Sequence, residues 1–83
     1  MKTSNVRFSK LRRLLLDLGF AETATDAYRR FEHPISGAVF LFRAYKPNEN
    51  VTMQDLVSTR THLDWRGLLA GNVFDDSLTT TSA

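Results

Sequence analysis

The feature that most constrains the fold is the stretch over residues 26–42, which has the pattern of two strands joined by a tight turn. Side chains alternate between the two faces of a strand, and both arms of this stretch can be read in that period. Pro34 cannot donate a hydrogen bond to a neighbouring strand, so the first arm ends at His33. Gly37 reaches the positive φ of a tight turn without steric cost. The pattern predicts a β-hairpin with strands near 27–33 and 38–44.

The alternation in the first arm assigns each side chain to a face of the sheet. Phe31 is the large apolar residue of this arm, so its parity marks the face that is turned to the core. Tyr28, Arg30 and Glu32 then lie on the opposite, open face, whereas Arg29 shares the core side with Phe31. If this protein holds a ligand on a sheet, the open face is where we expect it.

A helix is predicted ahead of the hairpin. Leucines repeat at the i, i+3, i+4, i+7 spacing of one helical face, at Leu11, Leu14, Leu15 and Leu18. Ser9 has the side chain of an N-cap, and Gly19 stands where a helix often ends in the left-handed conformation. These features predict a helix over residues 9–18. Residues 20–23 then enter the sheet as a short strand.

A second helix is predicted over about residues 53–66. Thr52 and Asp55 have the spacing of a capping box, with Asp in place of the more usual Glu or Gln. Gly67 is the expected stop, and Trp65 is expected to pack the end of this helix onto the sheet. The apolar stripe comprises Met53, Leu56, Val57, Leu63 and Leu68, with Thr59 or Arg60 between them.

The last segment carries a shorter helical pattern. Asn72 is expected to cap a turn over residues 73–78, in which Phe74 and Leu78 lie four residues apart and contact the rest of the protein. Together the segments predict the order α-β-β-β-α followed by this turn. The expected fold class is α+β, with a three-stranded antiparallel sheet and two helices on one of its faces.

Length and composition limit what the chain can be. Its 83 residues make one domain, with a core over about 8–78 and flexible ends at 1–6 and 79–83. The lack of cysteine excludes disulfides and thiolate metal sites, and two scattered histidines do not suggest zinc, so no metal or cofactor is expected. No apolar run approaches the roughly 20 residues of a membrane span, and no secretory signal opens the chain. We expect a soluble, cytoplasmic protein.

The charged residues are distributed unevenly along the chain. The formal net charge is only +2, but residues 1–46 hold nine Lys or Arg against four Asp or Glu. A basic front half fits a polyanion such as RNA as the partner. The alternative is a solvated basic surface that has no specific partner.

Three features, in their order along the chain, resemble a known family. A leucine-rich helix ends in Leu-Gly-Phe at residues 18–20, a hairpin carries Phe-x-His-Pro at 31–34, and a second helix follows. This arrangement, over roughly residues 8–66, resembles the HicA-type toxins of bacterial toxin–antitoxin pairs. The resemblance implies a fold like that of a double-stranded-RNA-binding domain and an activity as an mRNA interferase, that is, a ribonuclease that cleaves messenger RNA. It also implies a HicB-type antitoxin as the protein partner.

The chain departs from this family at the catalytic signature. Family members carry Gly-Ser-His, often with a second His, just upstream of Phe-x-His-Pro, and the first His is catalytic. Counting back from Phe31, that position falls on Tyr28, or on Ala27 if the strand carries a one-residue bulge. Histidine suits RNA hydrolysis because it titrates near neutral pH, whereas alanine has no acid–base group and tyrosine is a poor base there. Ribonuclease activity is therefore expected to be absent or nearly so.

Three interpretations of the missing histidine stay open. The chain is a homologue that binds RNA or a partner without cutting, a toxin in which Ala27 replaces the histidine, or a nuclease that uses another residue. His33 is the nearest candidate for that other residue. Its competing role is a hydrogen bond that holds the hairpin turn.

The side chains expected to contact RNA lie on the open sheet face and on a basic rim around it. Tyr28 offers a ring that can stack on a base, and basic side chains offer contacts to phosphates. The candidate RNA-binding residues are Arg12, Arg13, Tyr28, Arg30, Arg43 and Lys46.

A second function hypothesis rests on the weak net charge and the apolar stretch at 68–74. Under this hypothesis the protein is an interaction module or a homodimer without RNA affinity.

Overall fold

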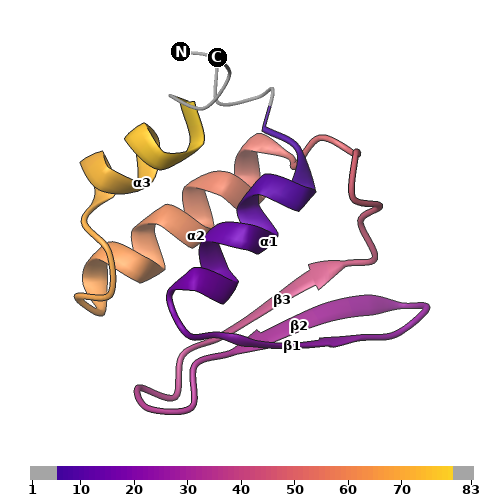
Figure 1. The fold of residues 1–83 in the computed structure, drawn as a ribbon, viewed down its shortest axis with the longest axis horizontal. Coiled ribbons are helices and arrows are strands. Elements are labelled where there is room, and N and C mark those ends of the chain that lie inside the picture. The colour runs from indigo at the N-terminus through magenta and orange to yellow at the C-terminus, as the bar shows by residue number, and fades with distance from the viewer. Residues whose placement is uncertain (1–5, 80–83) are drawn as a thin grey trace.

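The protein is described by a computed structural model over residues 6–79. Its elements are α1 (Phe8–Asp17), β1 (Ala21–Ala24), β2 (Tyr28–Glu32), β3 (Val39–Arg43), α2 (Met53–Trp65) and α3 (Gly71–Thr79). The strands form one antiparallel sheet in the order β1-β2-β3, and the helices lie on one face of it (Figure 1). This confirms the predicted α+β fold, with a third helix added where only a turn was expected.

The hairpin of β2 and β3 forms as predicted, with each strand one residue shorter at both ends. The backbone N–H of His33 donates to the carbonyl of Ala38 at 2.8 Å, which closes the connection between the strands. Gly37 has a φ of 79°, the left-handed conformation for which glycine was expected at this turn.

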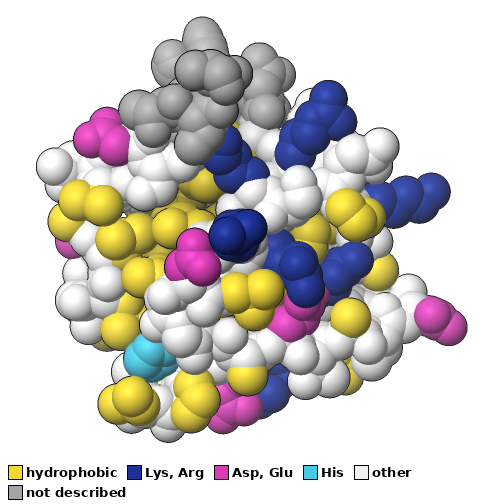
Figure 2. All heavy atoms as spheres, in the orientation of Figure 1, with side chains coloured by type: hydrophobic (Ala, Val, Ile, Leu, Met, Phe, Trp, Pro, Cys, Tyr) yellow, Lys and Arg dark blue, Asp and Glu magenta, His cyan; other side chains and the backbone are white. Residues whose placement is uncertain are grey.

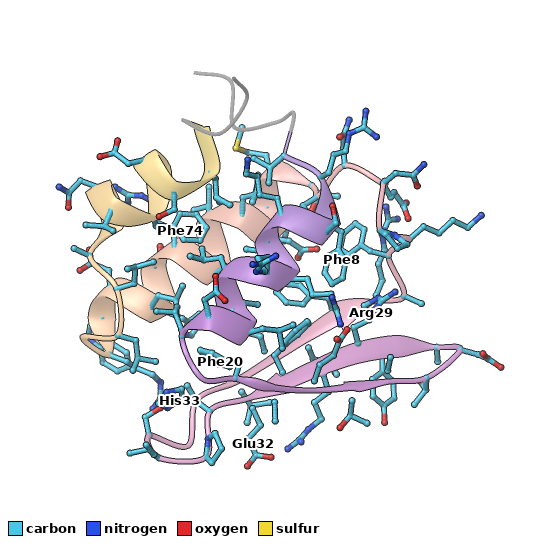
Figure 3. All side chains as sticks on the ribbon, in the orientation of Figure 1. Phe8, Phe20, Arg29, Glu32, His33 and Phe74 are labelled. Carbon is cyan, nitrogen blue, oxygen red and sulfur yellow. The ribbon has the colours of Figure 1, made fainter. Side chains whose placement is uncertain are left out.

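The two faces of β2 are also as predicted. Phe31 lies opposite Phe40 of β3 and is fully buried under the helices. Tyr28 lies on the other face with 37% of its surface exposed. Arg29 points toward α1, on the same side as Phe31, and Glu32 points away from the helices (Figure 3). The sheet therefore has one covered face and one open face.

Aromatic rings fill the space between the helices and the covered face. The ring of Phe8 in α1 stacks on Tyr45 at 5.2 Å between centroids and meets Phe42 edge-on at 6.0 Å. Such pairs add about 0.5–1.5 kcal/mol each beyond the burial of their area. Val6, expected in a flexible end, is buried at the margin of this core. The flexibility expected for residues 1–5 and 80–83 lies outside the described part of the chain.

The start of α1 differs from the prediction. The helix begins at Phe8, and Arg7 holds the N-cap position without a side-chain cap. The carbonyl oxygens of Glu49 and Pro47 accept hydrogen bonds from the N–H groups of Phe8 (2.8 Å) and Ser9 (2.9 Å). The prediction of Ser9 as N-cap was wrong because a loop distant in sequence already satisfies the first-turn amides that a cap would serve.

Glycine ends the first two helices, as the sequence predicted. Gly19 has a φ of 102°, and its N–H donates to Leu16 while the N–H of Phe20 donates to Leu15, both to carbonyl oxygens. This pair of bonds is a Schellman motif, which satisfies carbonyls at the end of the helix. Gly67 has a φ of 73° and ends α2 in the same way.

The cap of α2 confirms one half of the predicted capping box and replaces the other half. Thr52 Oγ1 accepts a hydrogen bond from the N–H of Asp55 at 3.2 Å. The return bond runs through the Tyr45 hydroxyl, which donates to Asp55 Oδ2 at 2.6 Å and accepts from the Thr52 N–H at 3.1 Å. Asp is one methylene shorter than Glu, and the tyrosine hydroxyl fills the place that a longer side chain would reach.

The apolar stripe predicted for α2 is only partly the buried face. Leu56, Thr59 and Leu63 are buried against the core, as expected. Met53 and Val57 are about half exposed, and Trp65 is 81% exposed. The prediction that Trp65 packs the helix onto the sheet was therefore wrong. The helix carries apolar residues on two faces, so the stripe could not be read from its sequence alone.

The C-terminal segment is a full helix, α3, rather than a short turn. Its first turn is marked by the bond from the N–H of Phe74 to the carbonyl of Ala70 at 2.9 Å, so Asn72 lies inside the helix and the predicted cap was wrong. Phe74 and Leu78 are buried, as the four-residue spacing predicted. α3 packs against α1 and α2 (Figure 1).

Candidate nucleic-acid interface

The open face of the sheet is the first candidate surface. No helix among residues 6–79 covers it, and it carries alternate residues of all three strands (Figure 1). Tyr28 is the register partner of Arg43, and Arg30 is the partner of Leu41. Leu41 is 65% exposed. The full set is Ala21 and Thr23 from β1, Tyr28, Arg30 and Glu32 from β2, and Val39, Leu41 and Arg43 from β3.

Both arginines of the open face already have acidic partners. Arg30 Nη1 lies 2.9 Å from Glu32 Oε1, and Arg43 Nη2 lies 2.8 Å from Glu49 Oε2. Their side chains are at least 40% exposed, and exposed ion pairs of this kind contribute about 0–1 kcal/mol. An RNA phosphate can therefore displace either carboxylate at small cost. Tyr28 is the exposed aromatic residue of β2 on this face, and the guanidinium of its register partner Arg43 lies 4.6 Å from the centroid of the Tyr45 ring.

A basic path leads from this face to α1. Arg43 pairs with Glu49, whose Oε1 also accepts the backbone N–H of Lys46 at 3.0 Å. The same loop contacts the start of α1, where the guanidinium of Arg7 donates to the carbonyl of Asn48 at 2.8 Å. We define the basic path as Arg43, Lys46, Arg7 and Lys10.

The cations of the basic path beyond Arg43 are available to a ligand. Within residues 6–79, no carboxylate lies within ion-pair distance of Arg7, Lys10 or Lys46. Lys and Arg side chains gather on the side of α1 and the β3–α2 loop, whereas hydrophobic side chains dominate toward α3 (Figure 2). The predicted residues Tyr28, Arg43 and Lys46 are thus brought together, with Arg7 and Lys10 as additions.

Arg12 and Arg13 have different environments although they are adjacent. Arg12 is held by Glu22 at 2.6 Å between Nε and Oε1, in a cluster that belongs to the fold. Arg13 is 77% exposed and lies 3.6 Å from Asp17. A contact of either residue with RNA stays a prediction. Arg13 would lose only a long, exposed ion pair on binding a phosphate, so its contact would cost less free energy than that of Arg12.

The cluster around Glu22 joins α1, β1 and β2. Glu22 Oε1 accepts from Arg12 and Oε2 accepts from Arg29 at 2.7 Å, and Arg29 also donates to the carbonyl of Tyr45 at 2.8 Å. Burial alone would raise the pKa of the Glu22 carboxyl, but the hydrogen bonds and charges of the two arginines outweigh burial. They hold the pKa of Glu22 below its ordinary value of 4.5. The alternation along β2 predicted Arg29 on the core side, but no pattern in the sequence indicated its acidic partner.

His33 is 8% exposed, and both of its ring nitrogens are engaged. Nδ1 accepts from the backbone N–H of Ser36 at 3.2 Å and lies 2.9 Å from the Ser36 hydroxyl, so the hydrogen bond to the turn is as expected. Nε2 lies 3.2 Å from the carbonyl oxygen of Leu18. Since Nδ1 is an acceptor, the network assigns the ring proton to Nε2, which donates to Leu18. A ring held in this way has no free nitrogen for proton transfer.

The positions that would hold the family histidine lie at the β1–β2 turn. Thr25 Oγ1 accepts from the N–H groups of Ala27 and Tyr28, both at 3.1 Å, and the Thr25 N–H donates to the Tyr28 carbonyl. Ala27 is exposed at the tip of the hairpin, and Tyr28 opens the strand on the open face. Neither position carries a histidine, the acid–base residue that the resemblance implies there.

The Leu-Gly-Phe and Phe-x-His-Pro segments meet in space. Besides the bond from His33 to Leu18, the ring of Phe20 lies 5.1 Å from the ring of His33. A β-carbon on Gly19 would lie 3.4 Å from His33 Nε2, so the glycine allows this close approach. Both segments thus form one joint between the end of α1 and the hairpin (Figure 3). The spacing along the sequence gave no sign of this contact.

Other kinds of site find little support. Within residues 6–79, no group of His, Asp or Glu is arranged to hold a metal ion, and no helix is long and apolar enough to cross a membrane. A shallow groove on α2 is lined by Arg60, Thr61, Asp64 and Trp65. Arg60 is fixed there by Asp75 at 3.0 Å. The groove is open and carries no reactive group.

Comparison of the chain with family models, with curated proteins and with solved structures found no match of any of the three kinds.

Proposed function

We propose that this chain is a HicA-like protein of a bacterial toxin–antitoxin pair, which binds RNA in the cytoplasm without cleaving it. The observation that carries the proposal is the joint between the Leu-Gly-Phe and Phe-x-His-Pro segments, in which His33 binds the Leu18 carbonyl. Motif residues that make one shared contact are better support for kinship than residues that only occur in the same order. The α-β-β-β-α core is the order that the resemblance implies.

The proposed RNA surface runs from Tyr28 along the basic path. Tyr28 stacks on an unpaired base at the end of the sheet, and Arg43 beside it contacts the neighbouring phosphate. Lys46, Arg7 and Lys10 continue the line of positive charge toward α1. Arg30 and Arg13 extend this surface on either side, and Arg12 contributes mainly through its ion pair with Glu22.

The proposed lack of cleavage follows from the environment of each candidate. Ala27 has no acid–base group, and within residues 6–79 no hydrogen bond joins the Tyr28 hydroxyl to a base. His33 has both nitrogens engaged. Cleavage through the 2′-hydroxyl requires a base for its proton and an acid for the leaving oxygen, and neither group is positioned.

A binding experiment tests the RNA surface. Fluorescence anisotropy with a labelled single-stranded RNA and an RNA hairpin is measured over a range of salt concentrations. Lys46→Gln should weaken binding and lower the salt slope by roughly 0.7–0.9, as expected for one lost phosphate contact. Arg66→Gln is the matched control, because Arg66 is an exposed cation away from the basic path, at the end of α2. No binding at low salt, or equal effects of the two variants, would contradict the proposal.

Tyr28 has its own control. Tyr28→Leu should cost about 1–3 kcal/mol of RNA binding, the range for one stacked base, whereas Tyr28→Phe keeps the ring and most of the affinity. Equal losses in the two variants would show that the ring does not stack.

A cleavage assay tests the proposed inactivity. The purified protein should leave messenger RNA intact, and Ala27→His or Tyr28→His should restore cleavage or toxicity in cells if one of these positions held the family base. Rapid cutting by the unmodified chain that survives His33→Ala would contradict the prediction.

A second candidate function is a protein-interaction module without RNA affinity. The observation in its favour is the exposure of Trp65 (81%), Ile35 (92%) and Val57 (52%), since exposed aromatic and aliphatic groups are common at interfaces. Of the apolar stretch at 68–74, Val73 (42% exposed) still supports this candidate, whereas Phe74 is buried and Leu68 and Leu69 pack against the core.

The two candidates predict different responses to the same variant. Under the first, a HicB-type antitoxin binds the protein and RNA binding survives Trp65→Ala. Under the second, no RNA binds at any salt concentration, and Trp65→Ala abolishes complex formation with the protein partner. Purification of the protein and of its Trp65→Ala variant from cells that express them, with RNA binding measured on the same samples, separates the two candidates.

A further inference from the structure

The outer edge of β3 presents backbone groups that no strand pairs. The bond from His33 N–H to the Ala38 carbonyl and the pairing of Phe31 with Phe40 show that Ala38, Phe40 and Phe42 turn their backbone groups toward β2. The intervening residues, Val39, Leu41 and Arg43, therefore turn their N–H and C=O groups outward. Within residues 6–79, only the Arg43 carbonyl is occupied, by the N–H of Tyr45 at 2.7 Å.

The two edges of the sheet are protected to different degrees. β1 is only four residues long. The side chain of Glu22, whose backbone groups point away from β2, is held by Arg12 of α1 beside this edge. β3 has no proline, no lysine and no bulge, and Val39 (47% exposed) and Leu41 (65% exposed) lie on its open face. An edge strand with unpaired backbone groups and apolar side chains is a template for another strand unless it is blunted.

We propose that the β3 edge pairs antiparallel with β3 of a second copy, with Leu41 on the twofold axis. This inference does not depend on the proposed RNA-binding function. The pairing places Leu41 opposite the partner's Leu41, and Val39 opposite the partner's Arg43. It continues the three strands of each copy into one sheet of six, and it uses the outward N–H and C=O groups of alternate residues on both chains.

The charges of the open face are complementary under this symmetry. Glu32 of β2 is the register partner of Val39. In the proposed dimer the partner's Arg43 lies on the other side of Val39, so it is two strand spacings from Glu32, roughly 9.6 Å between Cα atoms. The extended side chains of Arg and Glu together span that distance. Arg43 and Glu32 are paired with Glu49 and Arg30 within one copy, and both of these pairs are exposed, so each can be exchanged at small cost for an arginine–carboxylate contact between copies. No like charges face one another across the axis. This complementarity is why a second copy is the occupant that we infer.

The dimer should be weak, because one strand pair buries less area than a stable interface requires. Sedimentation equilibrium from micromolar to millimolar protein should show a dimer at the upper end of this range. Leu41→Lys places two ammonium groups opposite each other at the axis and should leave only monomer. Thr23→Lys is the matched control, since Thr23 lies on the same face but on β1, and it should leave the dimer intact. A monomer throughout, or equal effects of the two variants, would overturn the proposal.

Disulfide formation tests the register and does not depend on a charge change. The chain contains no cysteine, so a single introduced cysteine forms a disulfide only between copies. Leu41→Cys should cross-link under mild oxidation, because directly opposed residues of a hydrogen-bonded pair lie about 5.5 Å apart, within the range of a disulfide. Val39→Cys should not, because Val39 lies opposite Arg43 of the partner. Cross-linking of the second variant, or of neither, would overturn the proposed pairing. Both replaced side chains are exposed, and circular dichroism verifies that each variant folds.

Discussion

Nε2 of His33 lies 3.2 Å from the carbonyl oxygen of Leu18, and this contact fastens the hairpin to the end of α1. The other ring nitrogen holds the hairpin turn through Ser36. One buried side chain thus connects three segments, which explains the need for a histidine here without a catalytic role: a neutral imidazole is an acceptor at one nitrogen and a donor at the other.

His33→Ala should destabilise the fold by about 2–3 kcal/mol, because it removes two hydrogen bonds and leaves the Leu18 carbonyl without this partner. Urea denaturation followed by circular dichroism measures the change. His62→Ala is the matched control: His62 is exposed and its ring meets Phe40 edge-on at 5.9 Å, so the expected loss is below about 1 kcal/mol. Equal losses for the two histidines would contradict a structural role of His33.

Glu22 should make stability depend on pH in the acid range. Its pKa is lowered in the folded state, so the unfolded chain binds more protons when the pH lies between the two pKa values. The contribution of Glu22 is therefore complete above its ordinary pKa of 4.5 and is lost as the pH falls through the lower, folded pKa. The measurement is the urea midpoint between about pH 7 and about pH 3.

Removing the Glu22 carboxylate identifies its share of that dependence. Glu22→Gln should be less stable than the unmodified protein near neutral pH and should lose less stability on acidification. Glu32→Gln is the control, because Glu32 pairs with Arg30 on the open face and its side chain is 46% exposed. If the two variants had the same pH profile, the cluster around Glu22 would not contribute as described.

Phe31 and Tyr28 provide a test of the two faces of β2. Phe31→Ala should cost about 3–5 kcal/mol, since it opens a cavity beneath α1 at a fully buried site. Tyr28→Ala, on the open face, should change the free energy of unfolding by less than about 1 kcal/mol. Thermal and urea unfolding give both values. A larger loss from Tyr28 than from Phe31 would mean that the sheet is turned the other way.

Trp65 should report its exposure directly. It is the only tryptophan and is 81% exposed, so the emission of the folded protein should already have a maximum near that of the unfolded chain. Acrylamide should quench it with similar efficiency before and after unfolding. A strong red shift on unfolding would show that Trp65 is buried in solution. A blue shift on adding a partner would place that partner on α2.

The strands and their faces were predictable because the signals are local. Pro34 and Gly37 delimit the turn, and a period of two places Phe31 and Tyr28 on opposite faces wherever the strand lies. The helix ends at Gly19 and Gly67 could also be predicted from local sequence, because they require only the left-handed conformation of a single residue.

The errors and omissions involve contacts between segments far apart in the chain. Ser9 was not the cap of α1 because the carbonyls of Pro47 and Glu49 occupy its first amides. Arg12 binds Glu22, a pairing that no sequence pattern indicated, and its predicted contact with a phosphate stays a prediction. Trp65 was placed in the core because its size suggests burial, yet its position on α2 turns it away from the sheet.

The contact between the start of α1 and the β3–α2 loop affects how the chain folds during synthesis. α1 is synthesised before this loop: the carbonyl of Asn48 that its neighbour Arg7 binds comes 41 residues later, and the carbonyls that bind the first two helical amides flank Asn48. A nascent chain that stops before residue 47 therefore has a frayed first turn, and an isolated helix of this length is marginal in water. Phe8 of α1 also lacks its ring partners Phe42 and Tyr45 until β3 and the loop after it have been synthesised, so the packing of α1 on the sheet must follow their synthesis.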